Sequence, residues 1–212
     1  MKDQGQYDTE YSKCPCFWGK EPSKYVKLIP QYFSSGNVLD LGAGEGKNSF
    51  YLASLGFNVT AIEVSTYAVK NFLDRIIEES KKNDFSDNIN IIYGDVKKID
   101  DFVNKKFDIV VAYGLLHCFS SKTEIVEFLE KIKNITKPGG IHVISTFTNE
   151  LPVPEIQDYL ELTLLRKGEI KEYYKDWGIL KYEDGVLEHK HPTSKTTHQH
   201  SLCRIIAKNI NK

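Results

Sequence analysis

The chain has 212 residues, 41% of them hydrophobic, so it is long enough for one domain with a substantial core. Lysine and arginine number 28 and aspartate and glutamate number 29, which gives a formal net charge of -1. This balance argues against sequence-independent nucleic-acid binding, which requires a basic surface.

Short apolar segments alternate with segments of helical periodicity along most of the chain. Strands are predicted at 37–41, 58–64, 90–93, 107–113 and 141–147, followed by two extended segments at 179–188 and 201–208. Helices are predicted at 24–33, 47–55, 155–167 and 169–177. A further helix follows a Ser65 cap, and another runs from the capping box SKTE at 121–124 to KPGG at 137–140.

Strands that alternate with helices favour right-handed βαβ units and a parallel sheet covered on both faces. The two last extended segments have no long crossover helix between them, which indicates an antiparallel closure of the sheet. We therefore predict a single α/β domain with a Rossmann-like, doubly wound, mostly parallel sheet and an antiparallel last strand. Its core is expected at 37–212, with residues 1–36 as an N-terminal cap or lid.

The N-terminus is polar, and no apolar run approaches the roughly 20 residues of a membrane span. The four cysteines, at positions 14, 16, 118 and 203, form no regular disulfide framework. These features predict a cytoplasmic protein without a membrane anchor.

The segment VLDLGAGEG at 38–46 places glycines at every second position after a buried strand. A dinucleotide fingerprint has the spacing G-x-G-x-x-G, and a phosphate loop requires Gly-Lys-Ser/Thr, which GKN at 46–48 does not supply. Glycine spacing alone is weak evidence, because any tight strand-to-helix turn uses glycine. The ligand of the loop has to be inferred from the residues around it.

Three carboxylates stand at the ends of the first three predicted strands. Glu63 lies 21 residues after Gly42, where a carboxylate accepts hydrogen bonds from a ribose. Asp40 would face a pyrophosphate unfavourably, but it suits a ligand with positive charge. Asp95 has two open roles, accepting from an adenine amino group or capping a turn.

The segment 38–65, with GDV at 94–96, FDIVVAYGLLHCF and LEKIKNITKPGGIHVIS, resembles the class I S-adenosylmethionine-dependent methyltransferases. The resemblance covers about residues 37 to 148. It implies methyl transfer, S-adenosyl-L-methionine as cofactor, and a glycine loop that holds the methionine part. The predicted cofactor-binding residues are Trp18, Asp40, Gly42, Ala43, Gly44, Gly46, Asn48, Glu63, Val64, Asp95, Val96, Tyr113 and Gly114.

CFWGKEPSKYV near the start and EIKEYYKDWGILKYEDG near the end are similar to the TehB-like tellurite-resistance methyltransferases. This narrower resemblance implies a small, soft acceptor such as a tellurium or selenium oxyanion or a thiol. The group carries a histidine and arginines in its late segment, where this chain has LEHKHPTSKTTHQH. His189 matches the histidine, but Lys190 stands in place of an arginine and offers a point charge instead of a planar fork.

Five histidines are predicted to serve the acceptor. His117 follows the fourth strand and either lines the acceptor pocket or is a packed histidine. The late segment contributes His189, His191, His198 and His200, which converge if the two extended segments form a hairpin. The alternatives for this group are an acceptor pocket, a zinc or nickel site, and solvated strand ends. We predict no metal.

The N-terminal segment contains an aromatic pair and two closely spaced cysteines. Phe17 and Trp18 either cover the cofactor as a lid or belong to the core. Cys14 and Cys16 have the spacing C-x-C instead of the two-residue gap of common zinc motifs, so free thiols are favoured over a soft-metal site.

Three other functions remain possible at this point. The first is a dinucleotide-dependent oxidoreductase, which the glycine spacing and Asp40 disfavour. The second is a non-catalytic cofactor-binding protein with the same fold. The third is a methyltransferase for RNA or protein, which the neutral charge and the lack of a recognition domain disfavour. The expected partner is a small-molecule acceptor.

Overall fold

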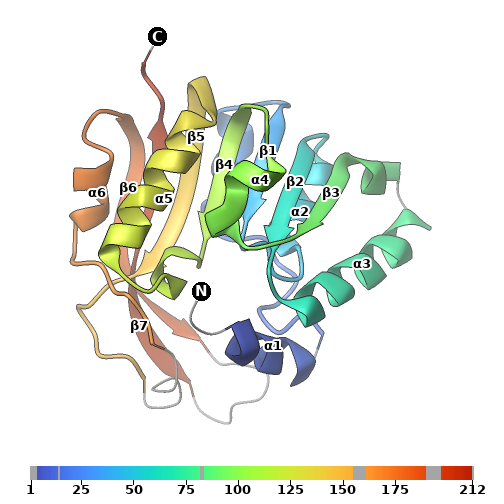
Figure 1. The fold of residues 1–212 in the computed structure, drawn as a ribbon, viewed down its shortest axis with the longest axis horizontal. Helices are drawn as coiled ribbons and strands as arrows, with labels where there is room; N and C mark the ends of the chain where they lie inside the picture. Colours follow the sequence, from blue (N-terminus) through green and yellow to red (C-terminus); the bar gives the residue numbers. More distant parts are fainter. Residues whose placement is uncertain (1–3, 14, 82–83, 155–160, 190–196, 212) are drawn as a thin grey trace.

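The computed structural model describes residues 4–13, 15–81, 84–154, 161–189 and 197–211 (Figure 1). Its strands are β1 (Asn37–Leu41), β2 (Asn58–Glu63), β3 (Ile89–Tyr93), β4 (Phe107–Tyr113), β5 (Thr136–Phe147), β6 (Gly178–His189) and β7 (His198–Lys208). The α-helices are α1 (Gln4–Lys13), α2 (Lys47–Ser54), α3 (Thr66–Ser80), α4 (Ile99–Phe102), α5 (Lys122–Asn134) and α6 (Glu169–Tyr173). Short 3-10 helices are η1 (Val26–Gln31), η2 (Asp84–Asn88), η3 (Val96–Lys98) and η4 (Leu116–Cys118).

The strands form one sheet in the order β3-β2-β1-β4-β5-β7-β6. The pairs from β3 to β5 are parallel, whereas β7 is antiparallel to both β5 and β6. The predicted single α/β domain with a mostly parallel sheet and an antiparallel last strand is therefore confirmed. The last two strands are also the predicted hairpin, with His189 opposite His198 in register.

Helix caps read from the sequence form as expected. The Ser65 hydroxyl accepts a hydrogen bond from the Ala68 N–H and starts α3. The Ser121 hydroxyl accepts from the Glu124 N–H, while the Glu124 carboxylate accepts from the Ser120 N–H. Each cap satisfies backbone donors that the first turn of a helix leaves without intrahelical partners.

The sheet is covered on both faces, and the buried residues of β1 divide between them because successive side chains point to opposite sides. Leu39 and Leu41 pack in the cluster that includes α4, α5 and α6 residues. Val38 packs in a second cluster with residues of η1 and α2. Figure 1 shows α5 in front of the sheet and α1 beyond the strand ends, beside α3. The layers leave the carboxyl ends of the parallel strands as the edge where a ligand binds.

Four local predictions were wrong. Helix α1 forms where the sequence indicates only a polar lead-in. Residues 161–167, the described part of a predicted helix, are not helical and carry only an isolated bridge at Leu165. Strand β5 begins at Thr136, so KPGG lies inside the strand instead of ending the helix. Helix α6 ends at Tyr173, before the predicted Trp177.

Among the described residues, no helix has the length and apolar character that a membrane span requires.

Candidate active site

The glycine loop lies between β1 and α2, and two of its glycines are required by close contacts. Gly44 and Gly46 have φ angles of 57° and 78°, in the left-handed region that favours glycine. A Cβ at Gly44 would lie 2.6 Å from the Tyr11 hydroxyl oxygen, and one at Gly46 would lie 2.2 Å from the Phe72 ring. The loop therefore combines a tight turn with packing that excludes side chains.

A cavity of about 250 Å³ opens beside this loop at the carboxyl ends of the strands. Its walls come from three regions: the N-terminal segment, the glycine loop with the start of α2, and the ends of β4 to β7. The lining residues are Tyr7, Tyr11, Trp18, Gly19, Ser23, Gly42, Ala43, Gly44, Glu45, Lys47, Asn48, Tyr113, Gly114, His117, Ser145, Phe147, Leu187, Leu202 and Arg204.

The cavity brings together part of the predicted cofactor-binding set. Seven of its members line the cavity: Trp18, Gly42, Ala43, Gly44, Asn48, Tyr113 and Gly114. The others lie at the same end of the sheet but outside the lining: Asp40, Gly46, Glu63, Val64, Asp95 and Val96. A role for any of these residues toward a cofactor stays a prediction.

Asp40 is buried below the glycine loop, with 1% of its surface exposed. Its carboxylate accepts a hydrogen bond from the Ser49 hydroxyl at 2.6 Å. Burial raises the pKa of the Asp40 carboxyl to about 6, while Ser49 and Lys47 act in the opposite direction. An ionised Asp40 at neutral pH is therefore a costly charge that a nearby cation would stabilise.

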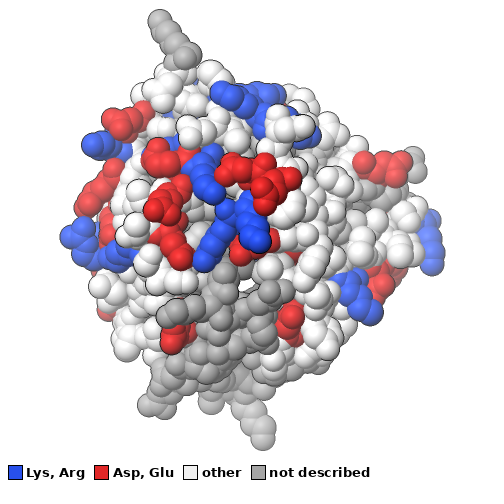
Figure 2. Space-filling view, in the orientation of Figure 1, with Lys and Arg blue, Asp and Glu red and all other residues white. Residues whose placement is uncertain are grey.

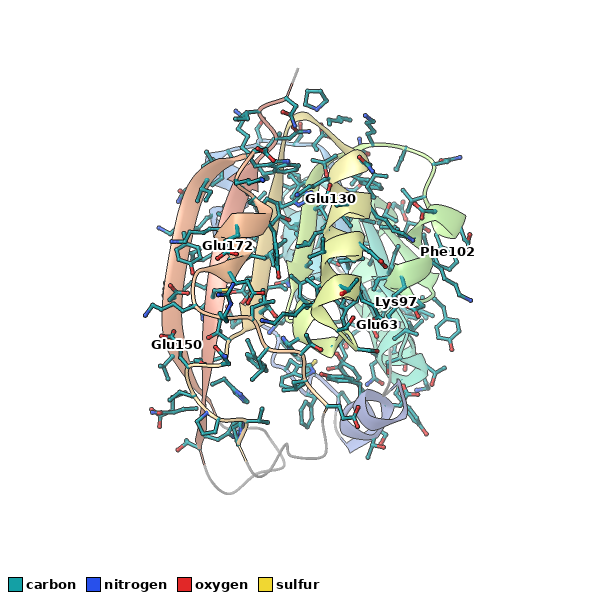
Figure 3. All side chains as sticks on the ribbon, turned by 60° about the vertical axis from the view of Figure 1, so that its left-hand side comes forward. Glu63, Lys97, Phe102, Glu130, Glu150 and Glu172 are labelled. Atoms are coloured by element: carbon teal, nitrogen blue, oxygen red, sulfur yellow. The ribbon has the colours of Figure 1, made fainter. Side chains whose placement is uncertain are left out.

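Glu63 organises the turn between β2 and α3. One carboxylate oxygen accepts from the Gly44 N–H at 2.7 Å, and the other accepts from the Val64 and Ser65 N–H groups at 2.9 and 2.8 Å. Burial raises the pKa of the Glu63 carboxyl, and these three hydrogen bonds oppose that rise. Figure 3 places Glu63 at the sheet end that faces α1. It thus joins the first two strand ends, and a ribose contact stays a prediction.

Asp95 has the capping role that the sequence left open. It precedes η3, and its Oδ1 accepts from the Lys97 N–H at 3.0 Å. Val96 beside it is buried. This geometry accounts for an aspartate at the strand end without a ligand, and the adenine contact remains a prediction.

The N-terminal segment is fastened to the glycine loop by Glu45, which the sequence analysis did not single out. The Glu45 carboxylate accepts from the Cys16 and Phe17 N–H groups, both at 2.7 Å, and from the Asn71 side chain at 2.9 Å. Lys47 adds a bond from its ammonium to the Trp18 carbonyl at 3.0 Å. A glutamate between two loop glycines was the only signal for this attachment.

Helix α1 continues this cover across the loop. Tyr11 packs with Phe17, and its hydroxyl lies over Gly44. Burial, followed by the charges of Glu63 and Glu45, raises the pKa of the Tyr11 hydroxyl well above its usual range. Asp8 at the same helix hydrogen-bonds the Ser65 hydroxyl. These contacts bring residues 4–13 and 15–18 against the cavity, and a lid function for this segment stays a prediction.

Replacing Glu45 with alanine should release the N-terminal segment without unfolding the sheet. The variant removes the acceptor of one part-buried and one buried backbone N–H group, and leaving a buried N–H group unsatisfied costs roughly 1–3 kcal/mol. Amide exchange at Cys16 and Phe17 should accelerate by at least about tenfold, and protease cleavage near these residues should precede cleavage elsewhere. Exposed Glu21, replaced with alanine, is the matched control. Unchanged exchange in the Glu45 variant would show that this carboxylate does not hold the segment.

Two rings of the cavity lining, His117 and Phe147, belong to a stack that continues to His200 and His198 outside the lining. The ring centroids of His117 and Phe147 are 4.1 Å apart, with an angle of 16° between the ring planes. Those of Phe147 and His200 are 4.3 Å apart, with an angle of 8°. His198 meets His200 edge-on at 5.0 Å. Burial lowers the pKa of His117 to about 3 and also lowers that of His198. His117, His198 and His200 therefore converge, and His117 is a neutral ring over the physiological pH range.

The rest of the histidine and cysteine predictions have separate outcomes. His191 and Cys14 lie outside the described residues, and the position of the His189 side chain is not described. Cys16 and Cys118 are free thiols, and Cys118 lies 3.0 Å from the Tyr7 hydroxyl. In the part of the chain that the structure describes, no group of three or more histidine, cysteine or acidic residues is arranged to hold a metal ion.

A family profile described as "Tellurite resistance protein TehB" matches residues 11–202 of this chain. The chain belongs to the TehB family. The match includes the N-terminal aromatic segment, the glycine loop and most of the late hairpin. The resemblance that the sequence motifs indicated is thereby confirmed at the level of the family.

Individual relatives agree with this membership. A "Probable S-adenosyl-L-methionine-dependent methyltransferase TehB" of Haemophilus influenzae is 28% identical over 153 residues, which are 71% of this chain and 49% of the relative. The chain therefore spans about half the length of the TehB relatives it matches. The crystal structure of TehB from the same species has a TM-score of 0.72 at 24% identity, covering 88% of this chain and 62% of the other.

The same fold occurs in enzymes whose substrates are unrelated to tellurite. A Burkholderia thailandensis 1,6-didemethyltoxoflavin-N1-methyltransferase with bound substrate and S-adenosylhomocysteine has a TM-score of 0.70. Its sequence is 16% identical, and the match covers 98% of this chain and 87% of that one. At this identity the likeness concerns the fold alone, so the TehB fold does not by itself specify an acceptor.

Proposed function

We propose that this chain is an S-adenosyl-L-methionine-dependent methyltransferase that acts on a small molecule through a soft chalcogen or thiol atom. The observation that carries the proposal is the meeting of the glycine loop and the ring stack across one cavity. The loop offers a cofactor side, and the rings offer an acceptor side. Membership of the TehB family, together with the names of its relatives, supports the same reaction.

The residues around the loop fit this cofactor. Gly42 and Gly44 line the cavity, and the lining is mostly uncharged, as an adenosine requires. Buried Asp40 suits a cationic ligand. The cofactor, when bound, supplies a methyl group on a sulfonium. We assign its methionine part to the 42–46 loop, Tyr113 and Gly114, its ribose to Glu63 and its adenine to Asp95 and Val96.

The state of His117 favours an acceptor that needs no general base. A ring whose pKa is about 3 stays neutral at pH 7 and does not take a proton readily. A chalcogen oxyanion, or a thiolate whose proton has passed to solvent, needs no base at the site, so the chain has to orient the acceptor and exclude water. We assign that orientation to His117, His198 and His200, with His189 and His191 as further candidates of the same segment.

The surface charges agree with a small-molecule partner. On the face shown in Figure 2, acidic and basic side chains are mixed over α5 and α6, and this face offers no continuous basic surface. A nucleic-acid substrate would be expected to meet such a surface. We further propose that the protein acts in the cytoplasm and that residues 1–36 close over the bound cofactor as a lid.

The test is the release of S-adenosylhomocysteine with a panel of acceptors: tellurite, selenite, thiols, thiopurines, small amines and tRNA. Turnover on the chalcogen or thiol members is the expected result. Turnover only on amines or tRNA would replace the acceptor class and leave the methyltransferase assignment in place. Cofactor binding with no turnover on any acceptor would favour a binding protein, and stabilisation by NAD alone would favour an oxidoreductase.

A further inference from the structure

Among the described residues, the wall of the cavity that is formed by strand ends carries a single charged side chain. The described lining residues from β4 onward are Tyr113, Gly114, His117, Ser145, Phe147, Leu187, Leu202 and Arg204. His117 is neutral, and Arg204 alone has a formal charge. One guanidinium thus stands in a wall of rings, aliphatic side chains and small polar groups.

Arg204 is held in a fixed orientation by its neighbours. In register, it lies opposite Ser145 of β5 and Glu183 of β6. Its Nε donates to the Tyr113 hydroxyl at 3.0 Å, and one terminal nitrogen lies 3.3 Å from a Glu183 oxygen. A guanidinium has five N–H donors, and these two are the ones that the described residues engage. The planar fork is therefore oriented but not saturated.

The nearby carboxylate does not neutralise this charge alone. Glu183 also binds the Lys24 ammonium, with both oxygens at 2.8 Å. Two cations therefore share one anion, and the trio has a net charge of +1. The Lys24 side chain is 59% exposed and is solvated, whereas the Arg204 side chain is 10% exposed. Arg204 is the less exposed of the two cations, so a further anion would relieve the cost of burial at its guanidinium more than at Lys24.

The other charged side chains of the described lining, Glu45 and Lys47, lie beside the glycine loop and not among the strand ends. The Glu45 carboxylate binds the backbone N–H groups of Cys16 and Phe17. The Lys47 ammonium binds the Trp18 carbonyl on the cofactor side of the cavity. Among the described lining residues, Arg204 is therefore the cation in the wall that the strand ends form.

We infer that Arg204 binds an anionic group of the methyl acceptor, so that the substrate is a small soft nucleophile bearing a carboxylate or an oxyanion. This inference rests on the proposed function. An arginine fork suits two oxygens of a planar anion, while Phe147 and Leu202 suit an apolar remainder. In the transfer, a thiol acceptor first loses its proton to solvent, and the lone pair of the deprotonated acceptor forms a bond to the methyl carbon as the carbon–sulfur bond of the sulfonium breaks. A neutral thioether cofactor product remains, and Arg204 forms no covalent bond.

A thiol series of matched size tests the charge requirement: 3-mercaptopropionate, its neutral amide 3-mercaptopropionamide, and cationic cysteamine. The wild type should show kcat/KM at least about tenfold higher for the carboxylate than for the amide. Arg204→Gln should remove that preference through KM, and Arg204→Lys should retain part of it. Equal kcat/KM values for the acid and the amide in the wild type would overturn the inference.

A binding measurement keeps the inference testable if no thiol is methylated. Calorimetry of the S-adenosylhomocysteine complex with 3-mercaptopropionate or selenite should give binding that Arg204→Gln weakens at least about tenfold. Such binding without turnover would refute the proposed reaction and retain the anion site. Binding that is absent, or that Arg204→Gln leaves unchanged, would overturn the site itself.

A carboxylate also occurs in the cofactor, and a second comparison separates the two sources. S-adenosylhomocysteine has the methionine carboxylate, whereas 5′-methylthioadenosine lacks it. If Arg204→Gln weakens the first ligand and not the second, the guanidinium serves the cofactor and the acceptor assignment is wrong. Urea unfolding of each variant checks the fold, and Arg166→Gln, at an arginine whose side chain is 63% exposed, is the matched control.

Discussion

Replacing Asp40 with asparagine should weaken S-adenosylmethionine binding by about tenfold or more and leave the free protein at least as stable as the wild type. Asparagine keeps an oxygen that accepts from the Ser49 hydroxyl, and it removes a buried negative charge. The cofactor is cationic at its sulfonium and its ammonium. Losing the attraction between these charges and Asp40 should therefore make the binding free energy less favourable, by roughly 1.5–3 kcal/mol for a charged interaction. Calorimetry at pH 7.5 measures the affinity, and urea unfolding measures the stability.

The stability of the wild type and its affinity for the cofactor should both depend on pH through the ionisation of Asp40. The pKa of Asp40 is about 6 in the folded protein and about 3.9 in an unfolded chain. The folded state therefore binds the proton more tightly, and the stability of the wild type should fall as pH rises from about 4 through 6. Asp40→Asn should lack this fall. Cofactor affinity in the wild type should decrease below pH 6, because a protonated Asp40 has to ionise first.

S-adenosylhomocysteine provides the control for this experiment, because it keeps the ammonium and lacks the sulfonium charge. Its affinity should fall less than that of S-adenosylmethionine in the Asp40→Asn variant. If both ligands bind the variant as tightly as they bind the wild type at pH 7.5, Asp40 has no electrostatic influence on the cofactor.

Replacing Gly46 with alanine should destabilise the fold by about 2–5 kcal/mol. The new Cβ would lie 2.2–2.6 Å from three atoms of the Phe72 ring, and the φ of 78° adds the strain of a left-handed backbone. Phe72 is fully buried and packs on Phe50 at 5.2 Å, so its ring has little room to move. The midpoint of urea unfolding, with its slope, measures the loss.

Gly56 is the matched control for this variant. It has a φ of 87°, and a Cβ there would meet nothing within 4 Å. Gly56→Ala therefore isolates the backbone strain, at about 1–2 kcal/mol. A Gly46→Ala variant no less stable than Gly56→Ala would show that Phe72 does not define the loop.

The sheet was predictable because its signals are local. The five parallel strands are short apolar runs separated by caps and glycines, and the hairpin of β6 and β7 follows from two adjacent extended segments. The errors arose where local signals are weak. Helix α1, QGQYDTEYSK, has no apolar period, and its position depends on contacts of Tyr11 and Asp8 with distant residues. Residues 161–167 have helix-forming side chains, yet Leu165 pairs with Thr148 instead.

The glycine loop, the carboxylates that end the first strands and the family were all predictable from the sequence, because each is carried by residues close together in the chain. The tertiary structure alone decided what surrounds them. Arg204 meets Tyr113 across 91 residues, and Lys24 meets Glu183 across 159. Strand register and the folding of the N-terminal segment onto Glu45 create these contacts. Contacts between residues so far apart in the sequence depend on how whole elements pack, and no local pattern of side chains specifies that packing.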